Sequence, residues 1–236
     1  MKRSKQLLGA VSTIALIAFS ASPALAGGST AGSSITNNVS VSFDVGGVTQ
    51  TAVTASNTFT VDRKIDVLVD FAGTAATSVA PGAQNQVLAF DVTNLSNAVV
   101  DIRLAAALNA GNAANIANFE VYRDTNGDRS LSAAELAAGP ITYLDEVAAD
   151  GTVAVIVIAD IGLGAVNGNE FDVVLTGTAR EGGTAGTQGA AITQTAGANT
   201  AGVDTVFTDG AGTTDAARDG AYSDVGKYVV AGATMS

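Results

Sequence analysis

The sequence predicts an all-β fold, an antiparallel sandwich with one short helix, and two patterns carry this prediction. Apolar and polar residues alternate in several short runs such as 39–45 (VSVSFDV), which is the period of a strand with one buried face. Turn residues such as Gly46-Gly47 and Pro81-Gly82 separate these runs at a spacing typical of sandwiches. Residues 132–138 are the only stretch that indicates a helix.

The expected strands follow one another from the start of the alternating region to the end of the chain. Residues 39–45 and 48–53 flank Gly46-Gly47, so they predict a hairpin with a two-residue turn. Later strands are expected at 65–71, 87–93, 99–104, 119–122, 141–144, 153–158, 171–175, 203–207 and 228–230.

The first 26 residues are typical of a secretory signal peptide. A basic start precedes the apolar run 7–19, and Ala24-Leu25-Ala26 places small residues before a cleavage point. The run falls short of the roughly 20 residues that span a bilayer, and no later stretch is long and apolar enough to span one. We therefore expect a bacterial protein that is secreted or held at the cell surface, with no transmembrane segment after cleavage.

The mature chain, residues 27–236, is expected to form a single β-sandwich domain. Residues 27–60 supply N-terminal strands, and 181–236 form a loop-rich C-terminal extension with a long hairpin. Residues 181–202 lack aromatic side chains and clear periodicity, so they either lie on the surface as a long loop or remain flexible.

Composition excludes several function classes. The chain has no His and no Cys, which excludes a Ser-His-Asp triad, a thiol nucleophile and disulfides. Its net charge is −11, and loss of the three basic residues of the leader lowers it to −14. Such a charge repels phosphate backbones, so no nucleic-acid partner is expected. These features favour a protein that is not an enzyme.

One motif points to a metal. Residues 124–135 (DTNGDRSLSAAE) have the oxygen-ligand spacing of an EF-hand calcium loop. Arg129 occupies the sixth position, where Gly is usual, so we expect a weak, structural Ca²⁺ site. The predicted ligands are Asp124, Asn126, Asp128, Ser130, Ser132 and Glu135.

A second interpretation of the same motif needs no ion. Ser132 and Glu135 match a capping box, and Gly139-Pro140 ends the segment, so the motif also fits an acidic turn before a capped helix. The cap explains two of the six ligand positions, those of Ser132 and Glu135. We favour calcium because the cap leaves the other four positions unexplained.

Other acidic residues are weaker candidates. Asp66 and Asp70 share a strand face, where paired carboxylates are able to hydrolyse glycosides but are more often solvated. The turn at 145–150 carries acids that are either loop charges or additional calcium ligands. Four more acids fall in the late loop, at spacings that match no known calcium loop: Asp209, Asp215, Asp219 and Asp224.

Five phrases, in this order, resemble bacterial cell-surface proteins with the conserved repeat domain of unknown function eleven. The resemblance covers roughly residues 35–230 and implies an Ig-like sandwich with a structural or adhesive role and no established catalytic residues. The phrases are SNTFTVDRKIDVLV, PGAQNQVLAFDVTNLSN, FEVYRDTNGDRSLSAAE, ITYLDEVAADGTVAVIVIADI and DTVFTDGAGTTDAARDGAYSD.

The sequence thus favours an exported structural or adhesive surface protein, stabilised by calcium. Its expected partners are other copies of itself or components of the surface or matrix. In one variant, residues 27–45 add as a strand to a neighbour's sheet edge and build a filament. The alternatives are a carbohydrate-binding module, which the absence of Trp disfavours, and a carboxylate-based hydrolase.

Overall fold

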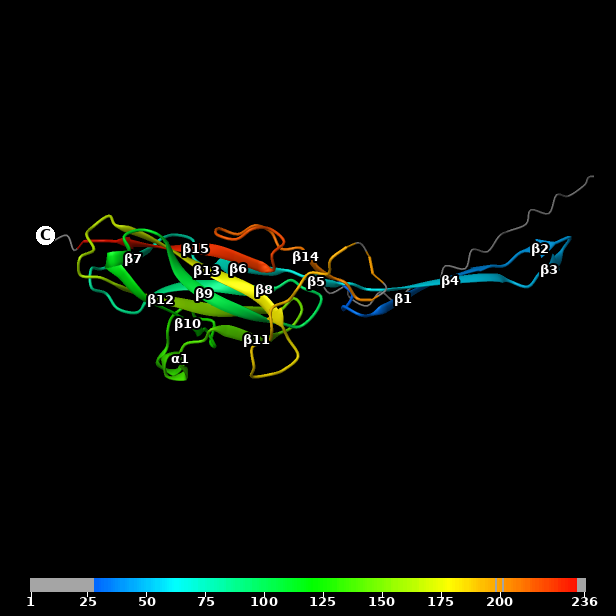
Figure 1. The fold of residues 1–236 in the computed structure, drawn as a ribbon, viewed down its shortest axis with the longest axis horizontal. Coiled ribbons are helices and arrows are strands. Elements are labelled where there is room, and N and C mark those ends of the chain that lie inside the picture. The colour runs from blue at the N-terminus through cyan, green and yellow to red at the C-terminus, as the bar shows by residue number, and fades with distance from the viewer. Residues whose placement is uncertain (1–27, 198, 201, 233–236) are drawn as a thin grey trace, which may run out of the picture.

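The structure is a computed structural model that describes residues 28–197, 199–200 and 202–232. The predicted signal peptide lies outside these residues. An elongated sandwich body carries a narrow two-stranded ribbon at one end, while the last strand of the chain ends at the other (Figure 1). No helix in the described part of the chain is long and apolar enough to cross a membrane.

Two sheets form the body. One has the order β10-β12-β8-β6 and the other the order β11-β9-β13-β15-β7, and all neighbours are antiparallel except β15 and β7. The first sheet consists of β6 (Val67–Phe71), β8 (Gln86–Asn94), β10 (Ile116–Arg123) and β12 (Thr152–Ile161). The second consists of β7 (Thr77–Val79), β9 (Val100–Ala110), β11 (Tyr143–Val147), β13 (Glu170–Glu181) and β15 (Ala221–Val230).

The core lies between these sheets, because alternate residues of each strand point inward. Phe90 and Phe171 are fully buried there, and the ring centroids of Phe71 and Phe90 lie 5.4 Å apart. The hydroxyl of Tyr228, from the second sheet, donates to the carbonyl of Gln86 in the first at 2.6 Å. The prediction of an all-β sandwich with one short helix is confirmed.

The helix, α1 (Ala133–Ala138), begins where the capping signal placed it. The Ser132 hydroxyl accepts a hydrogen bond from the Glu135 backbone N–H, and the Glu135 carboxylate accepts one from Ser132 N–H. Gly139, with a φ of 85°, ends the helix. A single 3₁₀ turn, η1 (Ala113–Asn115), precedes β10.

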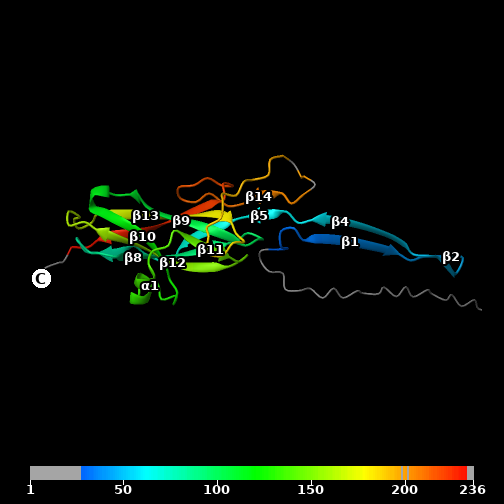
Figure 2. The same ribbon diagram turned by 60° about the horizontal axis from the view of Figure 1, so that its bottom comes forward.

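The N-terminal strands lie outside the sandwich. β1 (Ser34–Val41) pairs with β4 (Val53–Thr60), and β2 (Asp44–Val45) with β3 (Val48–Thr49) at the tip. Both Gly46 and Gly47 have positive φ, so the predicted two-residue turn is present. The hairpin stands clear of the body in two views (Figures 1 and 2). We call residues 34–60 the ribbon.

The C-terminal region returns to the body. β14 (Thr205–Phe207) pairs in parallel with β5 (Arg63–Ile65), which links the ribbon to β6. β15 begins at Ala221, well before the predicted strand at 228–230, because it pairs along most of β13. The described part of 181–202 continues from the end of β13 as a loop, and an isolated bridge pairs Arg180 with Ala191.

Candidate functional site

The ribbon has two chemically different faces. Its register pairs Ile35 with Phe59 and Val41 with Val53, and successive side chains alternate between faces. One face is therefore apolar except for one Asn row, with the pairs Ile35–Phe59, Asn37–Asn57, Val39–Ala55 and Val41–Val53. The other face is entirely polar, with the pairs Ser34–Thr60, Thr36–Thr58, Asn38–Ser56 and Ser40–Thr54.

The apolar face of the ribbon is exposed. Val41, Val53 and Phe59 are 53%, 60% and 49% exposed, respectively. More than half of the exposed large apolar side chains of the described residues belong to the ribbon: Val39, Val41, Phe43, Val45, Val48, Val53 and Phe59. A hairpin alone is only marginally stable in water, so this face is suited to contact with another surface.

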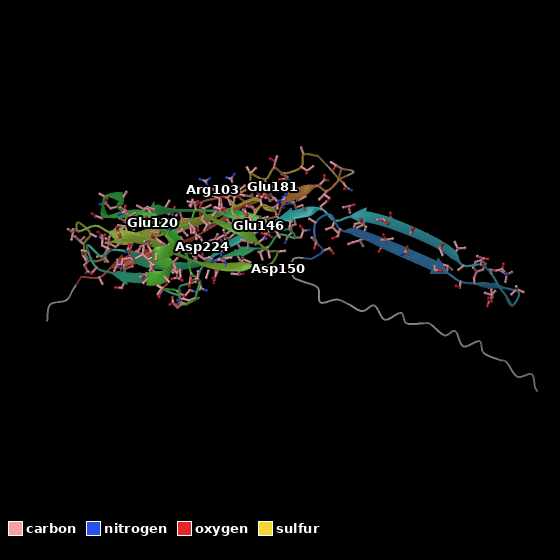
Figure 3. The ribbon with its side chains drawn as sticks, turned by 90° about the horizontal axis from the view of Figure 1, so that it is seen from below. Arg103, Glu120, Glu146, Asp150, Glu181 and Asp224 are labelled. Carbon is pink, nitrogen blue, oxygen red and sulfur yellow. The ribbon has the colours of Figure 1, made fainter. Side chains whose placement is uncertain are left out.

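The edges of the ribbon are also unprotected. Edge strands in soluble proteins usually carry Lys, Pro, bulges or inward charges that prevent pairing with other chains. The ribbon contains no Lys, Arg or Pro, and Asp44 near its tip is its one charged residue. The charged side chains labelled in Figure 3 all lie on the body. The strands β1 and β4 are thus uncharged, and each has one edge with no partner strand among the described residues.

Asn97 fixes the root of the ribbon to the body. Its side-chain N–H groups donate to the carbonyls of Ser29 (3.1 Å) and Asp62 (2.9 Å), and its side-chain oxygen accepts from Lys64 N–H at 2.9 Å. Asn97 is 7% exposed. Val61 also donates to the carbonyl of Ser33 at 2.8 Å. The body therefore holds both strands of the ribbon where they leave it.

The loop at 124–135 is shaped by its own carboxylates. Asp124 accepts hydrogen bonds from Gly127 N–H (2.6 Å) and Arg129 N–H (3.0 Å), so its two oxygens hold the turn. Asp128 accepts from the backbone N–H and the hydroxyl of Ser130, both at 2.8 Å. Asn126 accepts from Asp128 N–H at 3.0 Å and donates to its carboxylate at 2.9 Å.

Arg129 adopts the turn conformation that Gly usually provides. Its φ is 62°, in the left-handed region that costs a residue with a Cβ atom roughly 1–2 kcal/mol. Its guanidinium makes two parallel bonds to Asp91 of β8, at 2.8 and 2.9 Å. This hydrogen bonding raises the pKa of Arg129. The unusual residue therefore keeps the turn and fastens the loop to the first sheet.

The carboxylate of Glu135 is buried and fully hydrogen-bonded within the loop. The residue is 2% exposed, and one oxygen accepts from the N–H (2.7 Å) and hydroxyl (3.1 Å) of Thr125. The other oxygen accepts from the N–H (2.9 Å) and hydroxyl (2.8 Å) of Ser132. These bonds, led by the Ser132 backbone N–H, lower the pKa of Glu135 to about 2. Each carboxylate oxygen of Glu135 thus accepts two hydrogen bonds, which occupy its two lone pairs. Glu135 is therefore able to bind calcium only if at least the hydroxyls of Thr125 and Ser132 turn away.

A different trio of acids lies closest together. Within the described residues, Asp101, Asp145 and Glu146 are the one group of potential metal-ligating acids whose oxygens lie within 4.8 Å of one another. The carboxylates of Asp124, Asp128 and Glu135 are thus not gathered in this way.

Each carboxylate of the trio already accepts hydrogen bonds from backbone N–H groups. Asp101, which is fully buried, accepts from Glu146 N–H at 2.9 Å and Gly189 N–H at 2.8 Å. Asp145 accepts from Gly186 N–H, and Glu146 from the N–H groups of Gly183 and Thr184. Glu146 lies toward the ribbon end of the body (Figure 3). The trio therefore ties the start of the 181–202 loop to β9 and β11.

The remaining acidic candidates are dispersed. Asp66 forms an ion pair with Lys64 at 3.4 Å, while Asp70 is exposed on β6. The late-loop acids cap backbone N–H groups near and far: Asp209 those of 219 and 220, Asp215 that of 212, Asp219 those of 216 and 221, and Asp224 that of Phe71. Among the described residues, the late-loop acids do not gather into a group of three or more potential metal ligands.

Comparison with known proteins adds no function. No protein-family model matches the chain, and no curated protein matches it. The functional argument therefore depends on the features described above. Sequence reasoning singled out the acidic loop, but it did not identify the ribbon as a separate element or Asp101 as a neighbour of Asp145.

Proposed function

We propose that this chain is an exported, non-catalytic structural or adhesive protein of the bacterial cell surface, and that the ribbon is its assembly element. The observation that carries the proposal is the uncovered ribbon, with an exposed apolar face and unprotected edges. An element of this kind is poorly stable in water alone and gains stability when another surface covers it.

Two modes of contact are open to the ribbon. Its edges have free backbone groups that pair with a strand of another chain, and main-chain hydrogen bonds then supply affinity. Its apolar face buries side chains against a second layer. The expected partners are other copies of the chain or components of the surface or matrix. The leader-like N-terminus and the resemblance to cell-surface repeat proteins are in keeping with such a role.

Calcium at residues 124–135 is a second part of the proposal. The donor set fits Ca²⁺ in kind, because the six positions offer only hard carboxylate, amide and hydroxyl oxygens. Asp124, Asn126 and Asp128 already line one turn, and each of their side-chain oxygens keeps a lone pair except the Asp128 oxygen that accepts both bonds from Ser130. A bound ion would stiffen the loop and stabilise the folded body.

Excising the ribbon tests the function. Ser33 and Val61 are already hydrogen-bonded neighbours, so a Gly-Gly turn is able to replace residues 34–60. Because the body's sheets are complete without the ribbon, the shortened protein is expected to keep its melting temperature. Electron microscopy should show fibres or surface material for the wild type and none for the excised variant.

Three results would contradict the proposal. If assemblies persist after excision, the contacts that build them lie on the body and not on the ribbon. Retention of the purified protein on glycans would support a carbohydrate-binding module instead. Turnover of glycosides that is lost in Asp66→Asn or Asp70→Asn variants would support the hydrolase.

A further inference from the structure

We propose that the apolar face of the ribbon is covered by the same face of the ribbon of a second copy, with the two ribbons antiparallel and the two-fold axis at the Asn37–Asn57 row. The inference rests on the proposed function, since it names the partner of the assembly element. It is carried by the amphipathic register of β1 and β4, by the charge of the chain and by the edges of the body.

The edges of the body do not favour a strand from a neighbour. β10 is irregular between Ala117 and Glu120, and β11 between Leu144 and Val147. β7 has 3 residues, and the last N–H of β6, that of Phe71, is bound by the Asp224 carboxylate. Bulges, short strands and charged side chains are the devices that block edge pairing. β1 and β4 lack all of these along the eight residues over which they pair.

Charge favours contact between ribbons rather than between ribbon and body. All but one of the acidic residues, and every basic residue after the leader, lie outside the ribbon, so bodies repel one another while ribbons do not. In an antiparallel stack about the Asn row, the two roots lie roughly 26 Å apart along the strands, at about 3.3 Å per residue. This separation exceeds the Debye length of about 8 Å at physiological salt.

The Asn row sets the register. Burying an amide against valine leaves its donors and acceptor without partners, which is costly. In an antiparallel face-to-face stack, β1 lies over β1 of the partner and β4 over β4. If the axis passes through the Asn row, Asn37 meets its own counterpart and Asn57 does too, and each amide donates to and accepts from the other. Buried Asn residues set the register of coiled coils in the same way.

The same register matches large side chains to small ones. With the axis at Asn37 and Asn57, Phe59 of one ribbon faces Ala55 of the other, and Ile35 faces Val39. Large-against-small contacts across the layer are the arrangement that fills the space between two packed sheets. The register chosen by the polar row therefore also suits the Ile35–Phe59 and Val39–Ala55 rows, while the Val41–Val53 row lies beyond the stacked strands.

The contact is small and weak alone. A two-stranded face of 8 residues covers roughly 300 Å², given about 3.3 Å per residue and two strands about 4.8 Å apart, against about 800 Å² per partner in a standard interface. The open edges provide a second self-complementary contact. A subunit with two different two-fold contacts forms a chain rather than a closed dimer, as a structural filament requires.

Single cysteines test this arrangement, because the chain has none of its own. Exported variants Asn37→Cys, Val41→Cys and Asn38→Cys are treated with a thiol crosslinker that spans about 10 Å, the spacing of packed sheets. Asn37→Cys should give a crosslinked dimer as its main product. Val41→Cys, on the same face but four residues from the axis, and Asn38→Cys, on the polar face, should remain uncrosslinked.

The outcomes separate this inference from the proposed function. A dimer from Val41→Cys but not from Asn37→Cys would overturn the register, and a dimer from Asn38→Cys would overturn the face. If no variant crosslinks although association is lost on excision of residues 34–60, the ribbon remains the assembly element but the face-to-face stack is wrong. Association that survives excision, or a wild type that stays monomeric at every concentration, would overturn both.

Discussion

Arg129 illustrates how one residue reconciles a strained turn with a stable loop. The Gly position of the motif is filled by a residue with a φ of 62°, and the ion pair with Asp91 offsets part of the strain. Because both partners are partly exposed, the pair contributes less than about 1 kcal/mol. The motif anticipated a cost at this position but not Asp91, which lies 38 residues earlier and meets Arg129 only through the fold.

Substitution of Arg129 separates strain from charge. Arg129→Ala keeps the strain and loses the ion pair, whereas Arg129→Gly loses both. The Gly variant should therefore be more stable than the Ala variant by about 1 kcal/mol in urea unfolding. Equal stability of the two variants would mean that the backbone at this position is not strained.

Asp128 provides a test of calcium at the cost of one hydrogen bond, the one that the Asn126 amide donates to its second carboxylate oxygen. It is exposed, and Asn at this position is able to accept the same bonds from Ser130 while losing a charge. Ca²⁺ at ten times its Kd adds about 1.4 kcal/mol, so the wild type should melt roughly 3–5 °C higher, and magnesium should do less. Asp128→Asn should lose this response.

Two other variants serve as controls for calcium. Asp145→Asn should respond like the wild type, and a response lost there instead would place the ion at the Asp101 trio. Glu135→Gln is a poor test of an ion. Both carboxylate oxygens of Glu135 accept hydrogen bonds, so an amide nitrogen would face a donor and weaken the loop without any effect on an ion.

The pKa of Glu135 makes stability sensitive to acid. In the folded state it is about 2, below the ordinary value of 4.5. A depressed pKa contributes stability that is complete above the ordinary value and is lost as the pH falls through the folded value. With a chelator present, the free energy of unfolding should decline between pH 4.5 and about 2. Glu135→Ala should be less stable and show a flatter decline, and an unchanged slope would contradict this account.

At the scale of elements, the ribbon is a local hairpin. The sequence predicts that a hairpin forms here, but it does not predict that the hairpin lies outside the sandwich. Alternation and Gly46-Gly47 predict the turn and part of β1 because both signals are local, but β4 (Val53–Thr60) lies almost wholly beyond the predicted strand at 48–53. The separation of the ribbon from the body depends on which strands complete the two sheets, and no local pattern records this. For the same reason β9 and β15 are longer than their apolar runs, since pairing with β13 extends them through Ala-rich and polar stretches.

The two faces of the ribbon give a matched pair of substitutions. Val39 and Ser40 are neighbours on β1 that point to opposite faces, so Asp adds the same charge at either position. Val39→Asp should abolish self-association in sedimentation, because Val39 faces Ile35 of the partner in the proposed stack and a carboxylate cannot be buried there without a partner of opposite charge. Ser40→Asp should retain most of it. Equal loss in both variants would indicate that the edges, rather than the apolar face, dominate.

At the scale of the molecule, the sequence specifies the sandwich better than the site. Alternation and turn residues predict most of the buried residues of the body, although the alternating run 39–45 is exposed in the ribbon, and the helix cap is local. The acidic residues were harder to interpret, because a carboxylate that binds an ion and one that caps backbone N–H groups look alike in sequence. In the structure most of the acids considered, including Asp101 and Glu146, hold loops in place through backbone bonds.

The central claim is that the ribbon makes this protein assemble, and sedimentation of the exported wild type beside the variant lacking residues 34–60 tests it most directly. We expect the wild type to shift to larger species as its concentration rises, while the excised variant remains a monomer with an unchanged melting temperature. If the excised variant assembles as the wild type does, or if the wild type remains a monomer throughout, the claim is wrong.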